Sequence, residues 1–299
     1  KRIGFPLLIK ARAGGGGRGI RLVEREEEVE NAFLAASSEA ASAFGDGACY
    51  MEKFLRPVKH IEMQVIADQQ GNVVCLGERE CSVQRKNQKL IEESPSPVVD
   101  EETRRQMIDV STKAAKAVGY QGVGTIEFLY DREGNFYFME MNTRLQVEHP
   151  VTEMVTGIDL VKWQIRVAAG QPLGFSQEDI RLEGCAIECR INAENPSQGF
   201  RPSCGRVSLL HIPGGPWVRF DTALYQDYFV PPYYDSMIGK LIVHAKTREE
   251  AIRKMQAALC ELVIEGLDHN AEFQMDVLED EEFRNGTYTT NLMEKRGWV

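Results

Sequence analysis

The segment from Met139 to Glu148, MEMNTRLQVE, alternates residue by residue between polar and mostly apolar side chains. Such alternation is typical of a β-strand whose two faces meet different surroundings. The polar face carries an acid, an amide, a cation, an amide and an acid, in the order Glu140, Asn142, Arg144, Gln146 and Glu148. A strand with one face simply exposed to solvent does not require this particular set of acids, amides and a cation. We therefore expect a strand over 135–148 that carries a site.

The preceding segment, Gly122–Asp131, also has the pattern of a strand, and a loop of four residues, Arg132–Asn135, would join the two into a hairpin. In that register Glu127 lies opposite Glu140, with Cβ atoms ~4.5–5.5 Å apart on the same face of the sheet. Two bare carboxylates at that separation repel, and a divalent cation between them removes the repulsion. Two acids and Asn142 offer the oxygen ligands that Mg²⁺ prefers, so this register predicts a metal site.

This metal site has two alternatives at the level of the sequence. A loop of five residues would turn Glu127 to the opposite face, or the acids would form an unpaired, solvated edge. Along the predicted strand each pair of residues adds ~6.6–6.8 Å, which takes Glu148 beyond the reach of the same metal ion. Arg144 suits a small planar anion held by two hydrogen bonds, and Glu148 suits a general base. His149 falls on the opposite face, where we expect a structural role.

A run of glycines, ARAGGGGRG over 11–19, lies between two predicted strands, Pro6–Lys10 and Gly19–Val23. Glycine lets backbone N–H groups approach phosphates closely, but the dinucleotide-binding and P-loop signatures require a helix directly after the loop. Here a strand follows, so the glycines form either a plain hairpin tip or a flap that closes over a nucleotide. Lys10 and Arg18 favour the flap, because both can meet phosphate charge.

The rest of the chain contains further helices and strands. Helical spacing and capping signals predict helices over 26–44, 100–119, 152–170 and 247–263. Asp100, Thr152 and Thr247 are the expected N-caps of the last three. Residues 59–68 and 72–83 have the pattern of a strand pair, and a loop rich in Ser and Pro follows. From Arg181 onward the residue pattern is typical of short strands joined by turns.

The composition narrows the classes of function. The chain has 299 residues and a net charge of −10, which argues against a nucleic-acid partner and requires local cations for any anionic ligand. No apolar run approaches the ~18 residues of a membrane span. The seven cysteines form no CxxC pair, which favours a reduced cytoplasmic compartment over disulfides or a zinc site. Because the sequence opens at Lys1 inside an apparent structural element, we expect the natural protein to continue upstream.

Several motifs together resemble one family. The segment EMNTRLQVEHPVTE is similar to a signature of the biotin carboxylase component of biotin-dependent carboxylases, and further matches are IKARAGGGGRGI, MEKFL, ERECSVQRKNQK, ECRINAE and PPYYDSMIGKL. The resemblance covers essentially the whole chain. QVEHPVTE together with PPYYDSMIGKL separates it from other ATP-grasp enzymes, such as carbamoyl phosphate synthetase and the D-alanine ligases.

The resemblance implies an α+β chain with an ATP-grasp fold. A lid with a glycine flap would span 1–55, an antiparallel-sheet catalytic core 56–180, and a biotin carboxylase C-terminal region 181–299. The implied reaction has two steps. ATP and bicarbonate give carboxyphosphate and ADP, and the carboxyl group then moves to N1′ of biotin tethered to a carrier protein.

The resemblance also assigns roles to individual residues. Those implied for ATP are Lys10, Gly14, Gly15, Gly16, Gly17, Glu52, Lys53, Leu55, His60, Gln84 and Leu129. Those implied for Mg²⁺ or Mn²⁺ are Glu127, Glu140 and Asn142. Those implied for bicarbonate are Arg144, Gln146, Val147 and Glu148. Glu148 would be the base, and Lys89 would meet the transferred phosphate or bicarbonate.

Two further residues are implied for biotin. Arg190 would stabilise the enolate of biotin, and Asp235 would line the biotin pocket. By position alone, Arg190 is an ordinary strand arginine and Asp235 a turn former. One family position departs from the pattern, because Asn87 stands where many members have histidine. The family also has a whole domain before the lid, so we expect residues 1–299 to be incomplete and inactive by themselves.

The implied partners are a biotin carboxyl carrier protein, a carboxyltransferase subunit and a second copy of the chain. The sequence is most similar to the biotin carboxylase subunit of bacterial acetyl-CoA carboxylase, which serves fatty acid synthesis. The same domain of a propionyl-CoA, methylcrotonyl-CoA or pyruvate carboxylase is the alternative. A nucleotide-binding subunit without catalysis is the alternative from another class. It predicts that some residues of the polar face, from Glu140 to Glu148, are replaced by residues that cannot serve catalysis.

Overall fold

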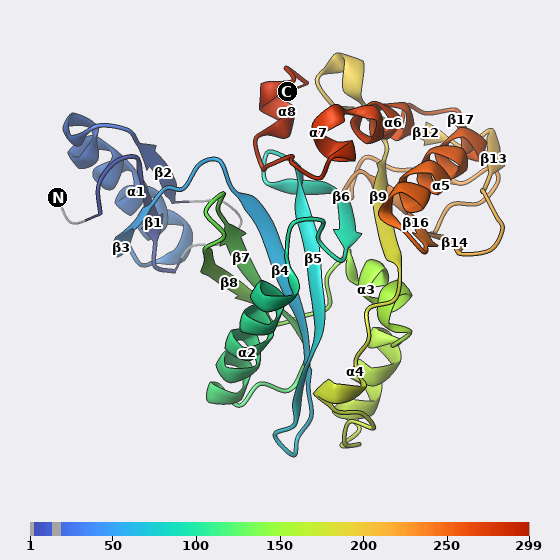
Figure 1. Cartoon of the computed structure of the whole chain (residues 1–299). Helices are drawn as coiled ribbons and strands as arrows, with labels where there is room; N and C mark the ends of the chain where they lie inside the picture. The colour runs from blue at the N-terminus through green and yellow to red at the C-terminus, as the bar shows by residue number, and fades with distance from the viewer. Residues whose placement is uncertain (1–2, 14–18, 299) are drawn as a thin grey trace. The chain divides into compact units, whose positions relative to one another are not determined.

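The computed structural model describes residues 3–13 and 19–298, and the chain divides into two compact units after Arg56 (Figure 1). The smaller unit is a three-stranded antiparallel sheet with the order β2-β1-β3. Its elements are β1 Leu7–Ala11, β2 Ile20–Val23, the 3-10 helix η1 Glu26–Glu28, α1 Val29–Phe44 and β3 Cys49–Lys53. The helix packs Ala36 against Leu7, Ile9 and Val23 of the sheet, which confirms the first predicted helix.

The larger unit is built on one eight-stranded antiparallel sheet with the order β14-β16-β9-β6-β5-β4-β7-β8. Its strands are β4 Lys59–Ala67, β5 Val73–Arg85, β6 Gln88–Ser94, β7 Gly122–Tyr130, β8 Phe136–Asn142, β9 Cys185–Asn192, β14 Val218–Thr222 and β16 Met237–Ala245. Short pairs join β10 Glu194–Asn195 to β11 Arg201–Pro202, β12 Gly205–Arg206 to β15 Phe229–Val230, and β13 Leu209–His211 to β17 Val263–Glu265. The large sheet takes strands from both sides of residue 181, and the division proposed there stays a prediction.

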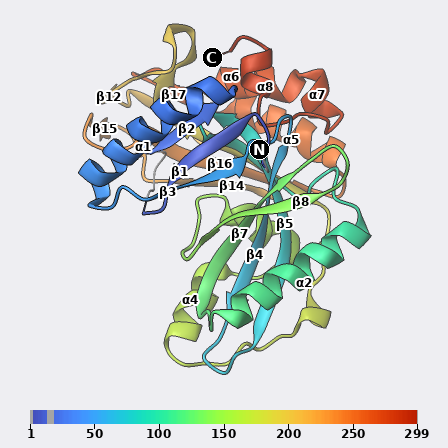
Figure 2. The same ribbon diagram turned by 90° about the vertical axis from the view of Figure 1, so that its left-hand side faces the viewer.

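Helices cover both faces of this sheet (Figure 2). On one face α2, Glu101–Ala117, packs Met107 against Ile61 and Met63 of β4. On the opposite face lie α3, His149–Thr156, and α4, Leu160–Ala168. The remaining helices are the 3-10 helices η2 Gln177–Asp179 and η3 Pro196–Gln198, then α5 Arg248–Glu261, α6 Ala271–Glu279, α7 Glu281–Arg284 and α8 Leu292–Lys295. Among the described residues, no helix combines the length and the apolar run needed to cross a bilayer.

Two of the predicted N-caps are confirmed and one is wrong. The Asp100 side chain accepts from the N–H of Thr103, and Thr247 forms a capping box at the start of α5. The single helix predicted over 152–170 is in fact α3 and α4, and Thr152 lies inside α3. Gly157, with φ +70°, ends α3, and the Asp159 side chain caps α4, so the local chemistry breaks the helix in two.

The β7–β8 hairpin confirms the predicted pair of acids by a different route. Tyr130 pairs with Phe136, so the loop contains the five residues 131–135 instead of four. A bulge then shifts the register by one residue and brings Glu127 opposite Glu140. The predicted loop is therefore wrong and the predicted pair is right, because an extra residue in β8 cancels the extra residue in the loop.

A second bulge turns Arg79 toward the face that carries the site. Between Met63 and Val65 of β4, the pairing with β5 shifts by one residue, and Gly77 lies at this irregularity with φ +88°. Beyond it, Arg79 pairs with Glu62 and bonds to its carboxylate. Strict alternation along β5 would place Arg79 on the other face, so the glycine bulge is what makes this contact possible.

Replacing Gly77 by alanine is expected to lower the free energy of unfolding by more than the ~1–2 kcal/mol that a positive φ costs by itself. A Cβ at this position would lie 2.8 Å from Leu182 Cδ2, so the leucine must also move. Gly71→Ala is the matched control, since Gly71 has φ +86° and nothing within 4 Å of the added Cβ. Urea denaturation measures both losses, and equal losses at the two positions would contradict the predicted clash.

Candidate active site

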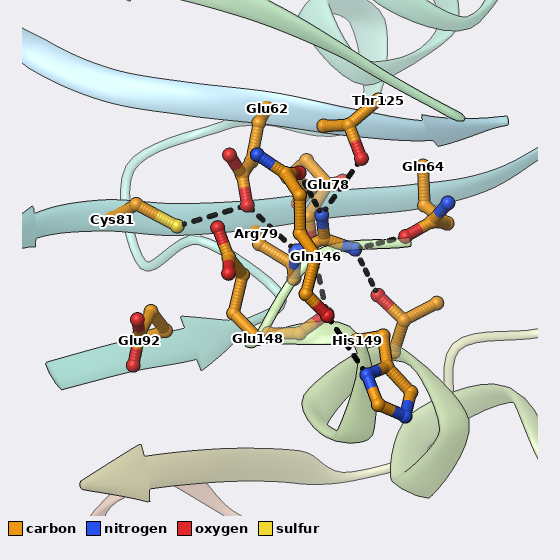
Figure 3. Close-up of polar contacts among 12 residues, drawn as sticks. Glu62, Gln64, Glu78, Arg79, Cys81, Glu92, Thr125, Gln146, Glu148 and His149 are labelled. Carbon is orange, nitrogen blue, oxygen red and sulfur yellow. Dashed lines mark hydrogen bonds and ion pairs between the residues drawn. The ribbon is translucent and has the colours of Figure 1, made fainter. Parts of the chain in front are cut away.

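One face of the eight-stranded sheet gathers a cluster of buried charged side chains, part of which is drawn in Figure 3. Glu62 of β4 and Glu127 of β7 are direct cross-strand partners, and Lys89 reaches both from β6. Glu148, the residue that precedes α3, completes the cluster. The three acids are almost fully buried, and the Lys89 side chain is 11% exposed. Three carboxylates therefore surround one ammonium group in a nearly closed site.

Lys89 Nζ lies 2.6 Å from Glu62 Oε2, 2.5 Å from Glu148 Oε1 and 3.3 Å from Glu127 Oε1. Burial by itself would lower the pKa of Lys89, but the neighbouring acids, Glu62 foremost, raise it well above its ordinary value. Burial would likewise raise the pKa of Glu62, yet the charges of Lys89 and Arg79 lower it to about 2. The lysine stays charged as a result, and it keeps Glu62 ionised.

The residues predicted to bind a metal ion adjoin this cluster. Asn142 Nδ2 is 2.9 Å from Glu127 Oε1 and 3.3 Å from Glu140 Oε1, so both carboxylates face one point. His60 Nε2 lies 2.9 Å from the other oxygen of Glu127. Burial would raise the pKa of Glu127, but His60 and Lys89 hold it well below its usual range. Two carboxylates and an amide, with Glu140 exposed to solvent, form an oxygen-rich donor set that fits Mg²⁺ or Mn²⁺.

The prediction that one strand continues to Glu148 is wrong, because β8 ends at Asn142. The chain turns there, and Gln146 folds back to donate to Glu127 Oε1 at 2.8 Å. Lys89 then links Glu148 to the same Glu127. The residues predicted to form separate metal and bicarbonate sites along a straight strand therefore lie in one continuous cluster. Alternation could not reveal the turn, since polar side chains at every second position also suit a loop that lines a site.

Three other residues of this segment differ in exposure. Arg144 is exposed, and its Nη2 donates to Asn142 Oδ1 at 3.3 Å. The carbonyl of Val147 accepts from Lys240 Nζ at 2.8 Å. His149 is buried at the start of α3, with Nδ1 2.9 Å from a backbone carbonyl oxygen, as a structural role requires. Arg144 thus presents an accessible cation beside the predicted metal ligands.

Arg190 of β9 lies against Glu148, so the structure brings together the residues predicted to contact biotin and to act as base. Its Nη2 is 2.6 Å from Glu92 Oε1 and 3.1 Å from Glu148 Oε2. Arg190 also pairs across the sheet with Lys240 of β16. Lys240 in turn lines a cavity of 380 Å³ together with Asp235, so this cavity adjoins the cluster. The Asp235 carboxylate accepts from the N–H of Met237 at 3.0 Å, which is a turn-forming contact.

The nucleotide residues predicted in the larger unit lie around His60. Gln84 Nε2 is 2.7 Å from His60 Nδ1, and the half-buried Leu129 pairs with His60 across β4 and β7. Asn87 lies in the turn between β5 and β6 with φ +64°. Asparagine tolerates this left-handed conformation better than most residues, which gives the departure at Asn87 a local structural reason.

The nucleotide residues predicted in the smaller unit lie on or directly after two adjacent strands. Lys10 Nζ of β1 pairs with Glu52 Oε2 of β3 at 2.7 Å. Lys53 Nζ donates to a backbone carbonyl at 2.7 Å, and Leu55 follows β3 as a half-buried residue. The flap predicted at Gly14, Gly15, Gly16 and Gly17 lies outside the described residues.

Sequence reasoning missed Glu62, Arg79 and Glu92. Arg79 is fully buried, and its guanidinium donates to the side chains of Glu62, Gln64, Thr125, Gln146 and Thr152. Figure 3 shows the first four of these side chains around the guanidinium. A signal was present in the strand KHIEMQVIA, which places Glu62 between apolar residues. An acid inside a buried strand requires a charged partner, and the next strand supplies Arg79.

Comparisons with known proteins agree with this arrangement. Residues 1–176 match the family described as the carbamoyl-phosphate synthase L chain, ATP binding domain. Residues 188–295 match the biotin carboxylase C-terminal domain. Biotin carboxylase 1 of Bacillus subtilis (strain 168) is 56% identical over 293 residues, which cover 98% of this chain and 65% of that protein. The chain thus spans slightly less than two thirds of the length of this curated relative.

Two solved structures are similar in fold and in sequence. The biotin carboxylase domain dimer of Hydrogenobacter thermophilus 2-oxoglutarate carboxylase, in complex with MgADP, ADP and bicarbonate, has a TM-score of 0.94 and 50% identity, covering 99% of this chain and 65% of that chain. Biotin carboxylase from Campylobacter jejuni, in a β-γ-ATP complex, has a TM-score of 0.94 and 53% identity, covering 98% and 65%. The chain has the ATP-grasp fold and belongs to the biotin carboxylase family.

Proposed function

We propose that the intact protein carboxylates carrier-bound biotin at the expense of ATP and bicarbonate, through carboxyphosphate. The observation that carries this proposal is the contact of Glu148 with both Lys89 and Arg190. A base for bicarbonate and a cation for the biotin oxygen lie side by side in a site with little solvent. The similarity to a domain solved with MgADP and bicarbonate supports the same assignment.

In the first step, bicarbonate attacks the terminal phosphorus of ATP, the bond to ADP breaks to give carboxyphosphate and ADP, and the bicarbonate proton passes to Glu148. Lys89 lies next to Glu148 and stabilises the negative charge of the transferring phosphoryl group. Glu127, Glu140 and Asn142 would hold Mg²⁺ or Mn²⁺, which neutralises phosphate charge when bound. Gln146 donates to Glu127 and holds that carboxylate in place. Arg144 would hold the bicarbonate anion.

In the second step, N1′ of biotin attacks the carboxyl carbon of carboxyphosphate, phosphate leaves, and the departing phosphate takes the N1′ proton. Arg190 donates to the oxygen that gains negative charge as biotin loses its N1′ proton. Its contacts with Glu92 and Glu148 fix the guanidinium before biotin arrives. The cavity beside Asp235 and Lys240 would receive the biotin ring. In the smaller unit, Lys10, the glycine flap, Glu52, Lys53 and Leu55 would bind ATP, as would His60, Gln84 and Leu129 in the larger one.

The proposed partners are a biotin carboxyl carrier protein, a carboxyltransferase and a second copy of the chain. The proposed final acceptor is acetyl-CoA, in line with the 56% identity to a bacterial biotin carboxylase. A 2-oxo acid is the second candidate acceptor, since a domain of a 2-oxoglutarate carboxylase is 50% identical. The acceptor is chosen by the carboxyltransferase, so assays with purified acyl-CoA and 2-oxo acid substrates and the partner subunit separate the two.

The full-length protein is expected to release ADP and form carboxybiotin only when ATP, bicarbonate and biotin are all present. Arg190→Ala should lower kcat for this reaction by ~100- to 1,000-fold, the usual loss for one donor to an oxyanion. Arg105→Ala is the control, because Arg105 is an exposed arginine of α2 whose ion pair with Glu102 is long, at 3.7 Å. Absence of carboxybiotin from the wild type, or full turnover by Arg190→Ala, would overturn the proposal.

A further inference from the structure

Glu188 of β9 is a fully buried acid for which the proposed reaction has no use. Neither of its carboxyl oxygens, nor Oε2 of Glu92, has a hydrogen-bond donor among the residues that the structure describes. An ionised carboxylate in that position would be strongly unfavourable, because buried charge requires partners. The unpartnered carboxyl oxygens must therefore be hydrogen-bonded to each other through a proton, or be bound by another group such as a water molecule or a cation.

The sheet places Glu188 and Glu92 directly opposite each other on neighbouring strands. Side chains at such positions point to the same face, with Cβ atoms ~4.5–5.5 Å apart. The charged groups that face Glu188 are Glu92 from β6, Lys240 from β16, Arg190 from its own strand and Glu148 before α3. From α3 itself come apolar side chains, Val151 and Val155, which pack with Ala186 and Ile242 around the β9 end of the pair.

The nearby cations have other partners. Lys240 Nζ donates to the carbonyl of Val147 at 2.8 Å. Arg190 divides its donors between Glu92 and Glu148. Glu92 therefore has a hydrogen-bonded cation to support its charge, whereas Glu188 has none among the residues that the structure describes. Burial, followed by the charge of Glu92, raises the pKa of Glu188 well above its ordinary value. Two adjacent buried carboxyl groups cannot both ionise, so the proton of the pair resides on Glu188.

We propose that Glu188 is a positioning residue that, as a neutral acid, donates a hydrogen bond to Glu92 Oε2 and so fixes the carboxylate that holds Arg190 beside Glu148. Both oxygens of Glu92 then have partners, with Oε1 bound to Arg190 and Oε2 bound to Glu188. The proposal rests on the proposed function for the role of Arg190 toward biotin. The protonated pair itself does not depend on any activity.

The first test is independent of turnover and uses the full-length protein. Infrared spectra at neutral pH are expected to show the carbonyl band of a protonated carboxyl group that disappears in Glu188→Gln. The control Glu183→Gln, five residues earlier on an exposed position, should leave the band in place. If the spectrum of Glu188→Gln keeps every protonated-carboxyl band of the wild type, the proposal is overturned. That result is expected if a buried water or cation, instead of a proton, lies between the two acids.

The second test reads the position of Arg190. The Nε–H of Arg190 bonds to Glu92 Oε1 at 2.6 Å, so its proton resonance should lie far downfield and is identified by its loss in Arg190→Lys. Glu188→Leu removes the donor and should shift this resonance, whereas Glu188→Gln, whose amide still donates, should keep it. A resonance unchanged in Glu188→Leu would contradict the positioning role, whether or not the protein carboxylates biotin.

Kinetics separate positioning from simple loss of stability. Glu188→Leu should lower kcat/KM for biotin by ~10- to 100-fold, which corresponds to one charge-supporting hydrogen bond. Glu188→Gln should retain turnover within ~threefold and should keep it at alkaline pH, where wild-type Glu188 ionises and repels Glu92. Equal losses in the leucine and glutamine variants would count against the proposal, since the two differ in the ability to donate.

Discussion

Replacing Glu148 by glutamine is expected to lower kcat for biotin carboxylation by ~100- to 10,000-fold, the usual contribution of a general base. Glutamine has the same shape and keeps one acceptor oxygen, for either Lys89 or Arg190, but it cannot take the bicarbonate proton. The fold is expected to survive, because two carboxylates, Glu62 and Glu127, still surround Lys89. The loss is measured as carboxybiotin formed per enzyme at saturating ATP, bicarbonate and biotin.

The matched control for this substitution is Glu153→Gln. Glu153 lies on the adjoining helix α3, is nearly as buried, and forms an ion pair with Arg219 at 2.7 Å. Its side chain also accepts from the N–H of Leu160, a contact that glutamine retains. The control should keep kcat, and both variants should keep the KM for ATP. A Glu148→Gln enzyme that turns over within tenfold of the wild type would remove Glu148 from the role of base.

The pairing of Glu127 with Glu140 shows what local sequence can predict. Period-two alternation fixes which residues share a face, and it identified both strands of the hairpin. The exact loop and the compensating bulge were beyond it, because a one-residue irregularity leaves no mark in the alternation. Helix ends were predictable where a side chain caps its own backbone, as at Asp100 and Thr247, since that chemistry is local.

The interior of the site was less predictable, because its contacts join strands that are distant in sequence. Lys89 meets Glu62 only because β5 lies between β6 and β4 in the sheet. The same order places Arg190 within reach of Glu148, although 42 residues separate them. Family resemblance supplied the residues proposed to bind ligands, but not Glu62, Arg79 or Glu92, which hold those residues in place through side-chain contacts. Such supporting residues follow from strand order, which alternation cannot reveal.

Arg79→Met is expected to lower the free energy of unfolding by ~3–5 kcal/mol, the cost of removing one partner from a buried ion pair. The guanidinium is fully buried and connects β4, β5, β7, the segment after β8 and α3 through side-chain hydrogen bonds. Methionine fills a similar volume but leaves Glu62 with one fewer cation. Arg79→Lys should lose less, because it keeps the charge while reaching fewer acceptors. Equilibrium unfolding in urea measures both variants.

The surface variant Arg105→Met is the control for this loss, and it should cost at most ~0.5 kcal/mol because its ion pair is exposed. A loss below ~1 kcal/mol in Arg79→Met would show that the network relaxes around the missing guanidinium. The pH dependence gives a sharper criterion. Because the folded pKa of Glu62 is lowered to about 2, its stabilising effect is complete above its unfolded pKa of 4.5 and is lost as the pH falls toward 2.

Removing Arg79 takes away one of the charges that lower this pKa, so in the variant the proton should bind to Glu62 at a higher pH. The difference in unfolding free energy between wild type and Arg79→Met should therefore be largest at neutral pH and shrink as the solution is acidified. A difference that stays constant from pH 7 to pH 3 would mean that lost packing and neutral hydrogen bonds, rather than the charge of Glu62, account for the loss.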